Sequence, residues 1–354
     1  MDWVPPGGDV VAPDRSIDAA VALRHWSLPE PWTVAPASAG LTNTTLFVET
    51  PTGTYVLRLY ELADPAGVRF EHGLLAELAA AHLPFTLAAP VRTRAGETFA
   101  QVVVGGATVL ASLTPLLPGT HPDPDDVEHA RRSGEALGRL GQALADVAPP
   151  PGRAQYPRLG DLRGFHPTVD DPAEAIGLIP SLAHADRKRL LAMTAHVEEV
   201  APSLYANLPR RLTHRDYWPP NILLTGDAVS AVLDFEFAGE DLRALDLTLA
   251  IAFWPLWGAG DVRLAACEAF IRGYAAVEPL TRAEAEAIPT LIRLQFATWL
   301  MHCAGRLRDG LTKTDRLQAF LVREALAYLD WSDATELVFT QSLVRWSAGG
   351  DEPA

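Results

Sequence analysis

The chain has 354 residues, of which 48% are hydrophobic and 21% are charged, and its formal net charge is −15. These values are typical of a soluble globular protein with room for two domains or one large one. Such an acidic surface repels phosphate backbones and anionic lipids, which argues against nucleic acid and membrane as partners. No segment approaches the roughly 20 uninterrupted apolar residues that span a bilayer, and the N-terminus lacks the basic start and apolar stretch of a secretion signal. We therefore expect a cytoplasmic protein.

The two cysteines, Cys267 and Cys303, lie in stretches with a helical pattern. We expect both to be buried thiols, because they form neither a disulfide framework nor a metal cluster. The sequence also has no H-E-x-x-H or C-x-x-C motif, so it offers no zinc site of the usual kind.

The first third of the chain predicts a small sheet with one helix. Residues 43–61 alternate apolar and polar side chains on both sides of a Pro-Thr-Gly turn, which indicates a hairpin. Apolar residues recur at helical spacing over 67–83. Two further strand-like runs, 98–104 and 107–113, are separated by a Gly-Gly pair. We assign residues 1–113 to a β-rich N-terminal lobe.

The rest of the chain is helical in pattern. Residues 114–118 are predicted to form a hinge, and residues 119–354 a larger C-terminal lobe in an α+β, bilobal organisation. Within that lobe the predicted helices are 127–147, 184–200 and most of the chain from 242 onward, the Pro-rich stretch 147–161 is predicted to be an exposed connector, and 210–235 contains short strand-like runs. Clefts between lobes commonly hold small-molecule sites.

Polar residues interrupt two of the short apolar runs in the larger lobe. The stretch LTHRDYWPPNILL (212–224) predicts a strand, a loop and a strand, with His214, Asp216 and Asn221 in the loop. The stretch AVLDFEFAGED (231–241) places Asp234 and Glu236 directly after an apolar strand. Carboxylate and amide oxygens of this kind suit Mg²⁺, which also takes phosphate oxygens and water as ligands.

These two stretches match the pattern H-R-D-x-x-x-x-N followed by D-F-x, the catalytic and metal-binding parts of the phosphoryl-transfer template. In that template one Asp accepts the proton of the substrate hydroxyl, and an Asn and a second Asp hold the metal ions at the nucleotide phosphates. The roles correspond to Asp216, Asn221 and Asp234, respectively.

The smaller lobe contains two features that this template requires. The stretch SAGLTNTTLF (38–47) is a turn of small residues that could bring backbone N–H groups to phosphates, and the candidates are Ser38, Gly40, Thr42, Asn43 and Thr44. Arg58 lies among apolar neighbours on the following strand, and Glu71 early in the next helix could hold it. The alternatives are an ordinary hairpin, a snorkelling Arg and a solvated Glu.

Over nearly its whole length the chain resembles the aminoglycoside phosphotransferase and choline kinase group of protein-kinase-like small-molecule kinases. The stretches that carry this resemblance are AGLTNTTLFVET, YVLRLYE, EHGLLAEL, LTHRDYWPPNILL and LDFEFAGEDLRALDLTLA. Residues 270–300 are instead similar to the type II homoserine kinases of this group. The resemblance implies a bilobal protein-kinase-like fold, ATP and Mg²⁺ as cofactors, and a small-molecule acceptor.

The chain departs from the usual pattern of the group at three positions. Arg215 follows His214 where members usually have a small residue or Asn, and Glu236 stands where many have Asp. Gly141 replaces the His of a Leu-His pair that often ends a helix. The second of these departures puts the role of Glu236 as a metal ligand in doubt.

Other residues are assigned supporting or acceptor-binding roles. His214 is expected to donate or accept a structural hydrogen bond behind Asp216, and Asp246 to start a helix and brace the catalytic loop. Candidates for the acceptor pocket are Glu236, Glu240, Asp241, Trp254 and Trp257, the last four as an aromatic and acidic wall for an ammonium group. The alternative for the tryptophans is core packing.

We therefore predict an ATP-dependent kinase that phosphorylates a hydroxyl of a small, amine-bearing metabolite, either homoserine-like or choline/ethanolamine-like. No long activation segment follows Asp234, which argues against a peptide substrate. An aminoglycoside-type phosphotransferase and a catalytically silent nucleotide-binding protein of the same fold are the alternatives. The acceptor's identity, a preference for ATP over GTP and the oligomeric state stay open.

Overall fold

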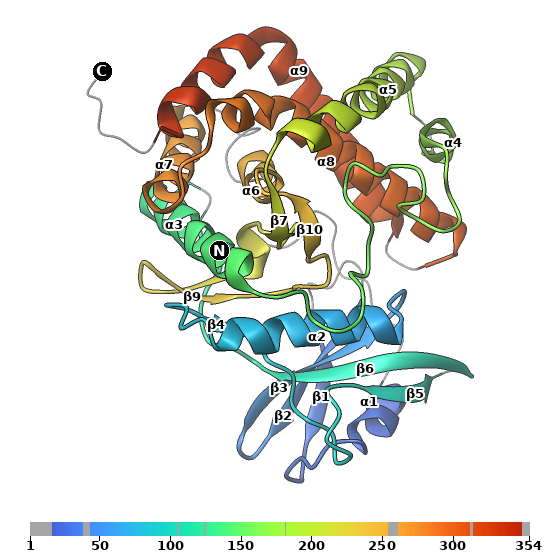
Figure 1. Ribbon diagram of the computed structural model, residues 1–354. Coiled ribbons are helices and arrows are strands. Elements are labelled where there is room, and N and C mark those ends of the chain that lie inside the picture. Colours follow the sequence, from blue (N-terminus) through green and yellow to red (C-terminus); the bar gives the residue numbers. More distant parts are fainter. Residues whose placement is uncertain are drawn as a thin grey trace.

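The computed structural model describes residues 16–37, 43–104, 106–123, 125–180, 182–253, 261–311 and 314–348. An antiparallel sheet with its helices forms one end of the molecule and a mostly helical lobe forms the other (Figure 1). The predicted α+β bilobal fold is therefore confirmed.

The sheet of the small lobe has five strands in the order β1-β2-β3-β6-β5. Its strands are β1 (Thr33–Pro36), β2 (Thr44–Thr50), β3 (Gly53–Tyr60), β5 (Ala100–Val104) and β6 (Ala107–Pro115). The predicted hairpin is β2–β3, in which Thr45 pairs with Arg58. On the other side Arg58 pairs with Ser112 of β6, so it lies on a central strand.

Two helices accompany this sheet, whereas the sequence predicted one. The helix that the sequence analysis missed is α1 (Ser16–Leu23), and Ala19, Ala22 and Leu23 pack with Trp26 against the apolar side chains of the sheet. The predicted helix is α2 (Pro65–Ala79), which begins at Pro65 because the Asp64 side chain caps it by accepting a hydrogen bond from the Gly67 N–H.

Helix α2 packs against both lobes. It lies between the sheet and the helical lobe (Figure 1). Phe70, Leu74, Leu75 and Leu78 on its buried face belong to the large apolar core that continues into the helical lobe. The face of α2 that carries these residues is thus removed from water by the larger lobe.

The larger lobe is built from helices. They are α3 (Val127–Asp146), α4 (Pro172–Gly177), α5 (His184–Asn207), α6 (Leu245–Phe253), α7 (Asp261–Val277), α8 (Arg282–Arg308) and α9 (Thr314–Trp346). Helices α3 and α7 lie very close together because Gly134 has no side chain: a Cβ there would lie 2.0 Å from the carbonyl oxygen of Phe270.

Short strands hold the loops of the predicted site. Strand β7 (Arg210–Thr213) pairs with β10 (Gly239–Leu242), and β8 (Ile222–Thr225) pairs with β9 (Ala228–Val232). Strand β4 (Thr86–Leu87) precedes β5 in the chain but pairs in parallel with β9. The predicted strand, loop and strand over 212–224 are β7, a loop with the 3₁₀ turn η1 (Pro219–Asn221), and β8.

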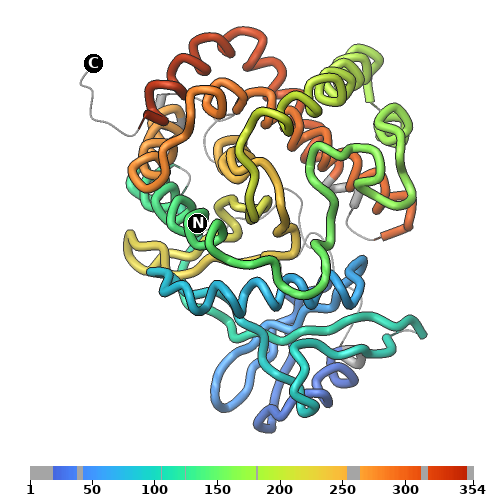
Figure 2. The backbone as a smooth tube through the Cα atoms, viewed as in Figure 1, coloured from blue at the N-terminus to red at the C-terminus, as the bar shows by residue number. Residues whose placement is uncertain are grey.

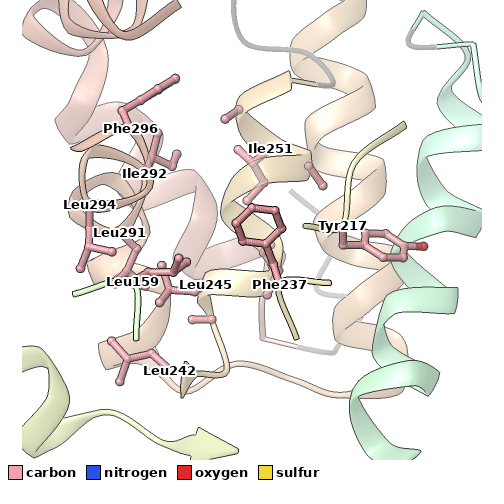
Figure 3. Close-up of a cluster of buried hydrophobic side chains, with 14 of the residues drawn as sticks. Leu159, Tyr217, Phe237, Leu242, Leu245, Ile251, Leu291, Ile292, Leu294 and Phe296 are labelled. Carbon is pink, nitrogen blue, oxygen red and sulfur yellow. The ribbon is translucent and has the colours of Figure 1, made fainter. Parts of the chain in front are cut away.

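The prediction that residues 147–161 form an exposed connector is only half right: residues 148–149, 151–153 and 157 are exposed. The stretch is irregular, but Tyr156 and Leu159 within it are buried. Figure 2 shows it, in green, passing between α2 and the helical lobe, and Figure 3 shows Leu159 among the buried apolar side chains near Phe237. Its prolines prevent regular structure, yet its carbonyl groups and apolar side chains still find partners in the interior.

Arg215 holds this stretch in the interior. Its side chain is fully buried and donates hydrogen bonds to three carbonyl oxygens, those of Phe237 (2.5 Å), Pro157 (2.5 Å) and Tyr156 (3.3 Å). It also pairs with Asp241 at 3.3 Å. The charge of Arg215 is thus neutralised by one buried carboxylate and solvated by backbone dipoles.

The remaining sequence expectations concern the cysteines and the membrane. Cys267 and Cys303 are free and fully buried, and burial raises the pKa of the Cys303 thiol to about 12. None of the described helices combines the length and the apolar character needed to cross a bilayer.

Replacing Arg215 by Met should lower the free energy of unfolding by about 3–5 kcal/mol, because it leaves the Asp241 carboxylate buried without its cation. Chemical denaturation measures this loss. The matched control is Arg210→Met: the side chain of Arg210 is 44% exposed and lies 3.8 Å from Glu240, so the cost should stay below about 1 kcal/mol. Equal costs for the two variants would contradict the role assigned to Arg215.

Candidate active site

The catalytic loop lies between β7 and η1 and is closed by a hydrogen bond between its ends. Asn221 donates through its side-chain amide to the backbone oxygen of Asp216 at 2.9 Å and to its carboxylate Oδ2 at 2.7 Å. The prolines of η1 turn the chain back so that Asn221 reaches Asp216. The amide nitrogen of Asn221 is engaged in this way, and the side-chain oxygen Oδ1 can act only as an acceptor.

His214 supports Asp216 from behind. Its Nδ1 accepts a hydrogen bond from the backbone N–H of Asp216 at 3.2 Å, and its Nε2 lies 3.0 Å from the backbone oxygen of Leu233. This pair of contacts fits the neutral ring with the proton on Nε2. Burial lowers the pKa of His214 to about 4, so the ring stays neutral and serves as a structural hydrogen-bonding group.

Asp246 holds the other side of the loop. Its carboxylate accepts hydrogen bonds from the backbone N–H groups of His214 at 3.1 Å and Arg215 at 2.7 Å. The backbone of Arg215 is left-handed, with a φ of 62°, and this conformation is unfavourable for a residue with a side chain. The hydrogen bonds to Asp246 are made in this conformation. Asp246 is the second residue of α6, which is the position that the sequence predicted for it.

Asp234 and Arg58 meet across the two lobes. Asp234 follows β9, has a φ of 61°, and keeps 26% of its side chain exposed. Arg58 Nη1 donates to Asp234 Oδ1 at 2.9 Å and lies 3.6 Å from Glu71 Oε1. Arg58 is therefore directed toward the larger lobe and is not a snorkelling surface residue.

Glu71 is buried beneath Arg58. It accepts a hydrogen bond from the hydroxyl of Tyr60 at 3.2 Å. Burial raises the pKa of Glu71 to about 8, even though the positive charge of Arg58 opposes the shift. The solvated Glu71 that the sequence left open as an alternative is not what the structure has.

Glu236 is buried and lies between the lobes. Its carboxylate accepts hydrogen bonds from the side-chain amide of Asn43 and, at 3.2 Å, from the hydroxyl of Tyr156. The oxygen of the Asn43 side chain accepts from the backbone N–H of Glu61 at 3.1 Å. Asn43, which the sequence placed near the nucleotide, thus links the small lobe to Glu236. The neighbouring residue Thr44 on β2 donates a hydrogen bond to Glu61 at 3.4 Å.

Negative charge exceeds positive charge in this cleft. The carboxylates of Glu71, Asp234 and Glu236 lie within 4.0 Å of the guanidinium of Arg58, and the charge of Asp216 also interacts with it. Burial first, and then the charge of Asp234, raises the pKa of Asp216 above its usual range and that of Glu236 to about 7. A bound cation would relieve this repulsion, and the oxygen donors of Asn221 and Asp234 are of the type that Mg²⁺ prefers.

The acceptor-pocket candidates lie in different places. Glu240 is exposed beside Arg210. Asp241 is fully buried and accepts hydrogen bonds from the backbone N–H of Leu159, from Tyr205 and from Arg215, so we correct its assignment from the acceptor wall to the interior. The two residues differ because successive side chains of β10 point to opposite sides.

Five of the predicted residues, Ser38, Gly40, Thr42, Trp254 and Trp257, lie outside the described residues. Conversely, the sequence analysis missed Tyr156, which reaches Glu236 from a Pro-rich stretch with no motif around it. It treated Arg215 only as a departure from the group's pattern, although a lone Arg beside the catalytic Asp was a signal of a buried ion pair.

A family model described as the phosphotransferase enzyme family matches residues 33–280. A homoserine kinase of Acidiphilium cryptum is 33% identical over 280 residues, which cover 78% of this chain and 81% of that protein. A homoserine kinase of Granulibacter bethesdensis is 32% identical over 263 residues, covering 73% and 77% of the two chains.

Solved structures agree on the fold. A microcompartment-associated aminopropanol kinase superposes with a TM-score of 0.68 at 16% identity, over 93% of this chain and all of that one. An amicoumacin kinase solved with AMP-PNP and Ca²⁺ superposes with a TM-score of 0.63 at 16% identity, over 89% and 93% of the two chains. The chain belongs to the phosphotransferase enzyme family and transfers phosphoryl groups to a hydroxyl of a small molecule.

Proposed function

We propose that this protein transfers the γ-phosphoryl group of ATP to the side-chain hydroxyl of homoserine, with Mg²⁺ as the metal ion. The observation that carries the proposal is the joined geometry of Asp216, Asn221 and Asp234 with Arg58 in a cleft with excess negative charge. Support for homoserine as the acceptor comes from the relatives that bear this activity as a name and match about three-quarters of the chain.

In this proposal Asp216 orients the acceptor hydroxyl and accepts its proton as the oxygen attacks phosphorus. Burial raises the pKa of Asp216 above that of an exposed aspartate, which is the direction that favours proton acceptance by the ionised carboxylate. The hydrogen bonds from Asn221 and the backbone contact with His214 keep the carboxylate in place. Asn221 and Asp234 would hold Mg²⁺, which neutralises charge on the β- and γ-phosphates when bound.

Arg58 would bind nucleotide phosphate oxygens. Its guanidinium can donate two parallel hydrogen bonds, and its contact with Glu71 keeps it directed into the cleft. In the structure the same group pairs with Asp234. The small-residue turn that includes Ser38, Gly40 and Thr42, and its neighbours Asn43 and Thr44, remain the proposed backbone contacts to the phosphates.

The direct test is a phosphate-transfer assay with ATP and Mg²⁺ over a panel of acceptors: homoserine, amino alcohols, sugars and aminoglycosides. We expect O-phosphohomoserine as the product formed with the highest kcat/KM. A panel in which an amino alcohol or an aminoglycoside is the preferred acceptor, with homoserine unreactive, would refute the proposed acceptor.

Asp216→Asn should lower kcat by about 100-fold or more and leave nucleotide binding and folding intact, because the amide cannot accept the proton. Steady-state turnover and thermal unfolding measure the two properties. Asp227→Asn is the matched control, since the Asp227 side chain is 76% exposed in the β8–β9 turn. Turnover of the Asp216 variant within a few-fold of the wild type would remove Asp216 from the mechanism.

Asp234→Ala should abolish the tightening of ATP binding by Mg²⁺, because the metal loses its fixed carboxylate. Calorimetric titration with ATP, with and without Mg²⁺, gives this difference directly. Asp227→Ala again serves as the control. If Mg²⁺ strengthens ATP binding to the Asp234 variant as much as to the wild type, the metal is bound elsewhere.

Arg58→Lys should raise the KM for ATP and lower kcat, and Arg58→Met should do both to a greater extent, because Lys keeps only a point charge and Met removes it. ATP titrations of both variants measure the effects. Arg69→Lys and Arg69→Met are the controls, because Arg69 is exposed on α2. Kinetics of Arg58→Met that match the wild type would show that Arg58 does not bind phosphate.

A further inference from the structure

A hydroxy amino acid carries a carboxylate in addition to the hydroxyl that is phosphorylated, and a charge-assisted hydrogen bond from a guanidinium is a strong way to bind a carboxylate away from water. Within the described chain, two of the arginines near the cleft are already committed. Arg58 pairs with Asp234 and Glu71, and the donors of Arg215 go to three carbonyls and Asp241. The third arginine is Arg306, near the end of α8.

The side chain of Arg306 is almost completely buried, with 2% of its surface exposed. Its Nη2 donates to Oε2 of Glu61 at 2.8 Å. Its Nε, in contrast, has no hydrogen-bond partner anywhere in the described chain. A buried N–H of a guanidinium without an acceptor costs free energy, which suggests that a ligand provides the missing acceptor.

Two sets of contacts connect Arg306 to the catalytic cleft. Through Glu61 it reaches Asn43, whose side-chain amide donates to Glu236. On the same face of α8, one turn before Arg306, His302 packs against the ring of Tyr156 with centroids 5.4 Å apart, and Tyr156 also donates to Glu236. Arg306 is therefore connected to Asn43 and Tyr156, which both donate hydrogen bonds to Glu236. Glu236 is two positions after Asp234 in the chain.

A cavity of about 260 Å³ is lined by Glu61, the partner of Arg306, although Arg306 itself does not line it. Glu61 and Thr44 line it from the small lobe, and Gly310 and Leu311 line it from the turn that follows α8. The backbone N–H of Leu311 donates to the backbone oxygen of Arg306, so this wall of the cavity is continuous with the helix that carries the guanidinium.

From this geometry we infer that Arg306 binds the carboxylate of the acceptor and selects hydroxy amino acids over amino alcohols. The inference rests on the proposed function and adds the residue that sets the acceptor class. The carboxylate would accept from the unpartnered Nε of Arg306. A decarboxylated acceptor such as 3-aminopropan-1-ol, which keeps the hydroxyl and the amine of homoserine, gains nothing from this contact.

The test compares homoserine with 3-aminopropan-1-ol and with homoserine amide, a neutral analogue of similar size. The wild type should have a higher kcat/KM for homoserine than for either analogue. Arg306→Met should lower kcat/KM for homoserine by about 10- to 100-fold, mainly through KM, and change that for 3-aminopropan-1-ol by less than about 3-fold. Arg306→Lys, which keeps the charge, should restore part of the preference.

The matched control is Glu61→Gln, which removes the present partner of Arg306 and keeps the guanidinium. The ratio of kcat/KM for homoserine to that for 3-aminopropan-1-ol should be kept or increased in this variant. Calorimetric titration of homoserine into the wild type and the Arg306 variants measures binding without turnover. We expect the affinity to be highest for the wild type, lower for Arg306→Lys and lowest for Arg306→Met.

Three results would overturn the inference. The first is a wild type that does not distinguish homoserine from its amide. The second is an Arg306→Met variant that loses activity equally toward both acceptors, and the third is a Glu61→Gln variant that loses the preference as fully as Arg306→Met. The second and third results would show that the Arg306–Glu61 ion pair is only a structural contact between the lobes. Turnover of sugars or aminoglycosides alone would instead refute the proposed function.

Discussion

The arrangement of this protein depends on the crowding of carboxylates around one guanidinium at the junction of the lobes. Arg58 lies on a central strand of the small lobe, and the acids that surround it come from α2 and from the loop that follows β9. Burial raises the pKa of both Glu236 and Glu71, and repulsion from neighbouring carboxylates adds to the shift. A divalent cation could balance this excess of negative charge, and the same cation would then also offset the charge of a bound phosphate chain.

The second requirement is that the catalytic loop must not move, and backbone hydrogen bonds to buried ions provide this rigidity. Asp246 accepts two N–H groups of the loop, and Arg215 donates to three carbonyls of neighbouring segments. The desolvation of each buried ion offsets much of the stability that its contacts contribute. The main effect of these contacts is therefore to fix the geometry of the loop. The left-handed backbone at Arg215 and at Asp234 is maintained by the same surroundings.

The residues that join the lobes include several to which we assign roles in catalysis and binding. Asp234, Glu236 and Arg306 of the larger lobe pair with Arg58, Asn43 and Glu61 of the smaller one. Binding of nucleotide and acceptor would therefore compete with contacts between the lobes, which links ligand binding to their relative position.

Local sequence was enough to determine many of the elements and the motif residues, although it did not predict helix α1. Alternation over 43–61 and helical spacing over 127–147 predicted the hairpin and helix α3, and the spacing of Asp216, Asn221 and Asp234 predicted the reaction class. These signals are local, because they depend on neighbours within a few residues. Tertiary structure decided the rest: the burial of Tyr156 and Leu159 in a Pro-rich stretch, the interior position of Asp241, and the meeting of Glu61 with Arg306, which is 245 residues away in the chain. No local pattern encodes such contacts, because each depends on which distant partner can satisfy a buried charge or carbonyl once the chain has folded.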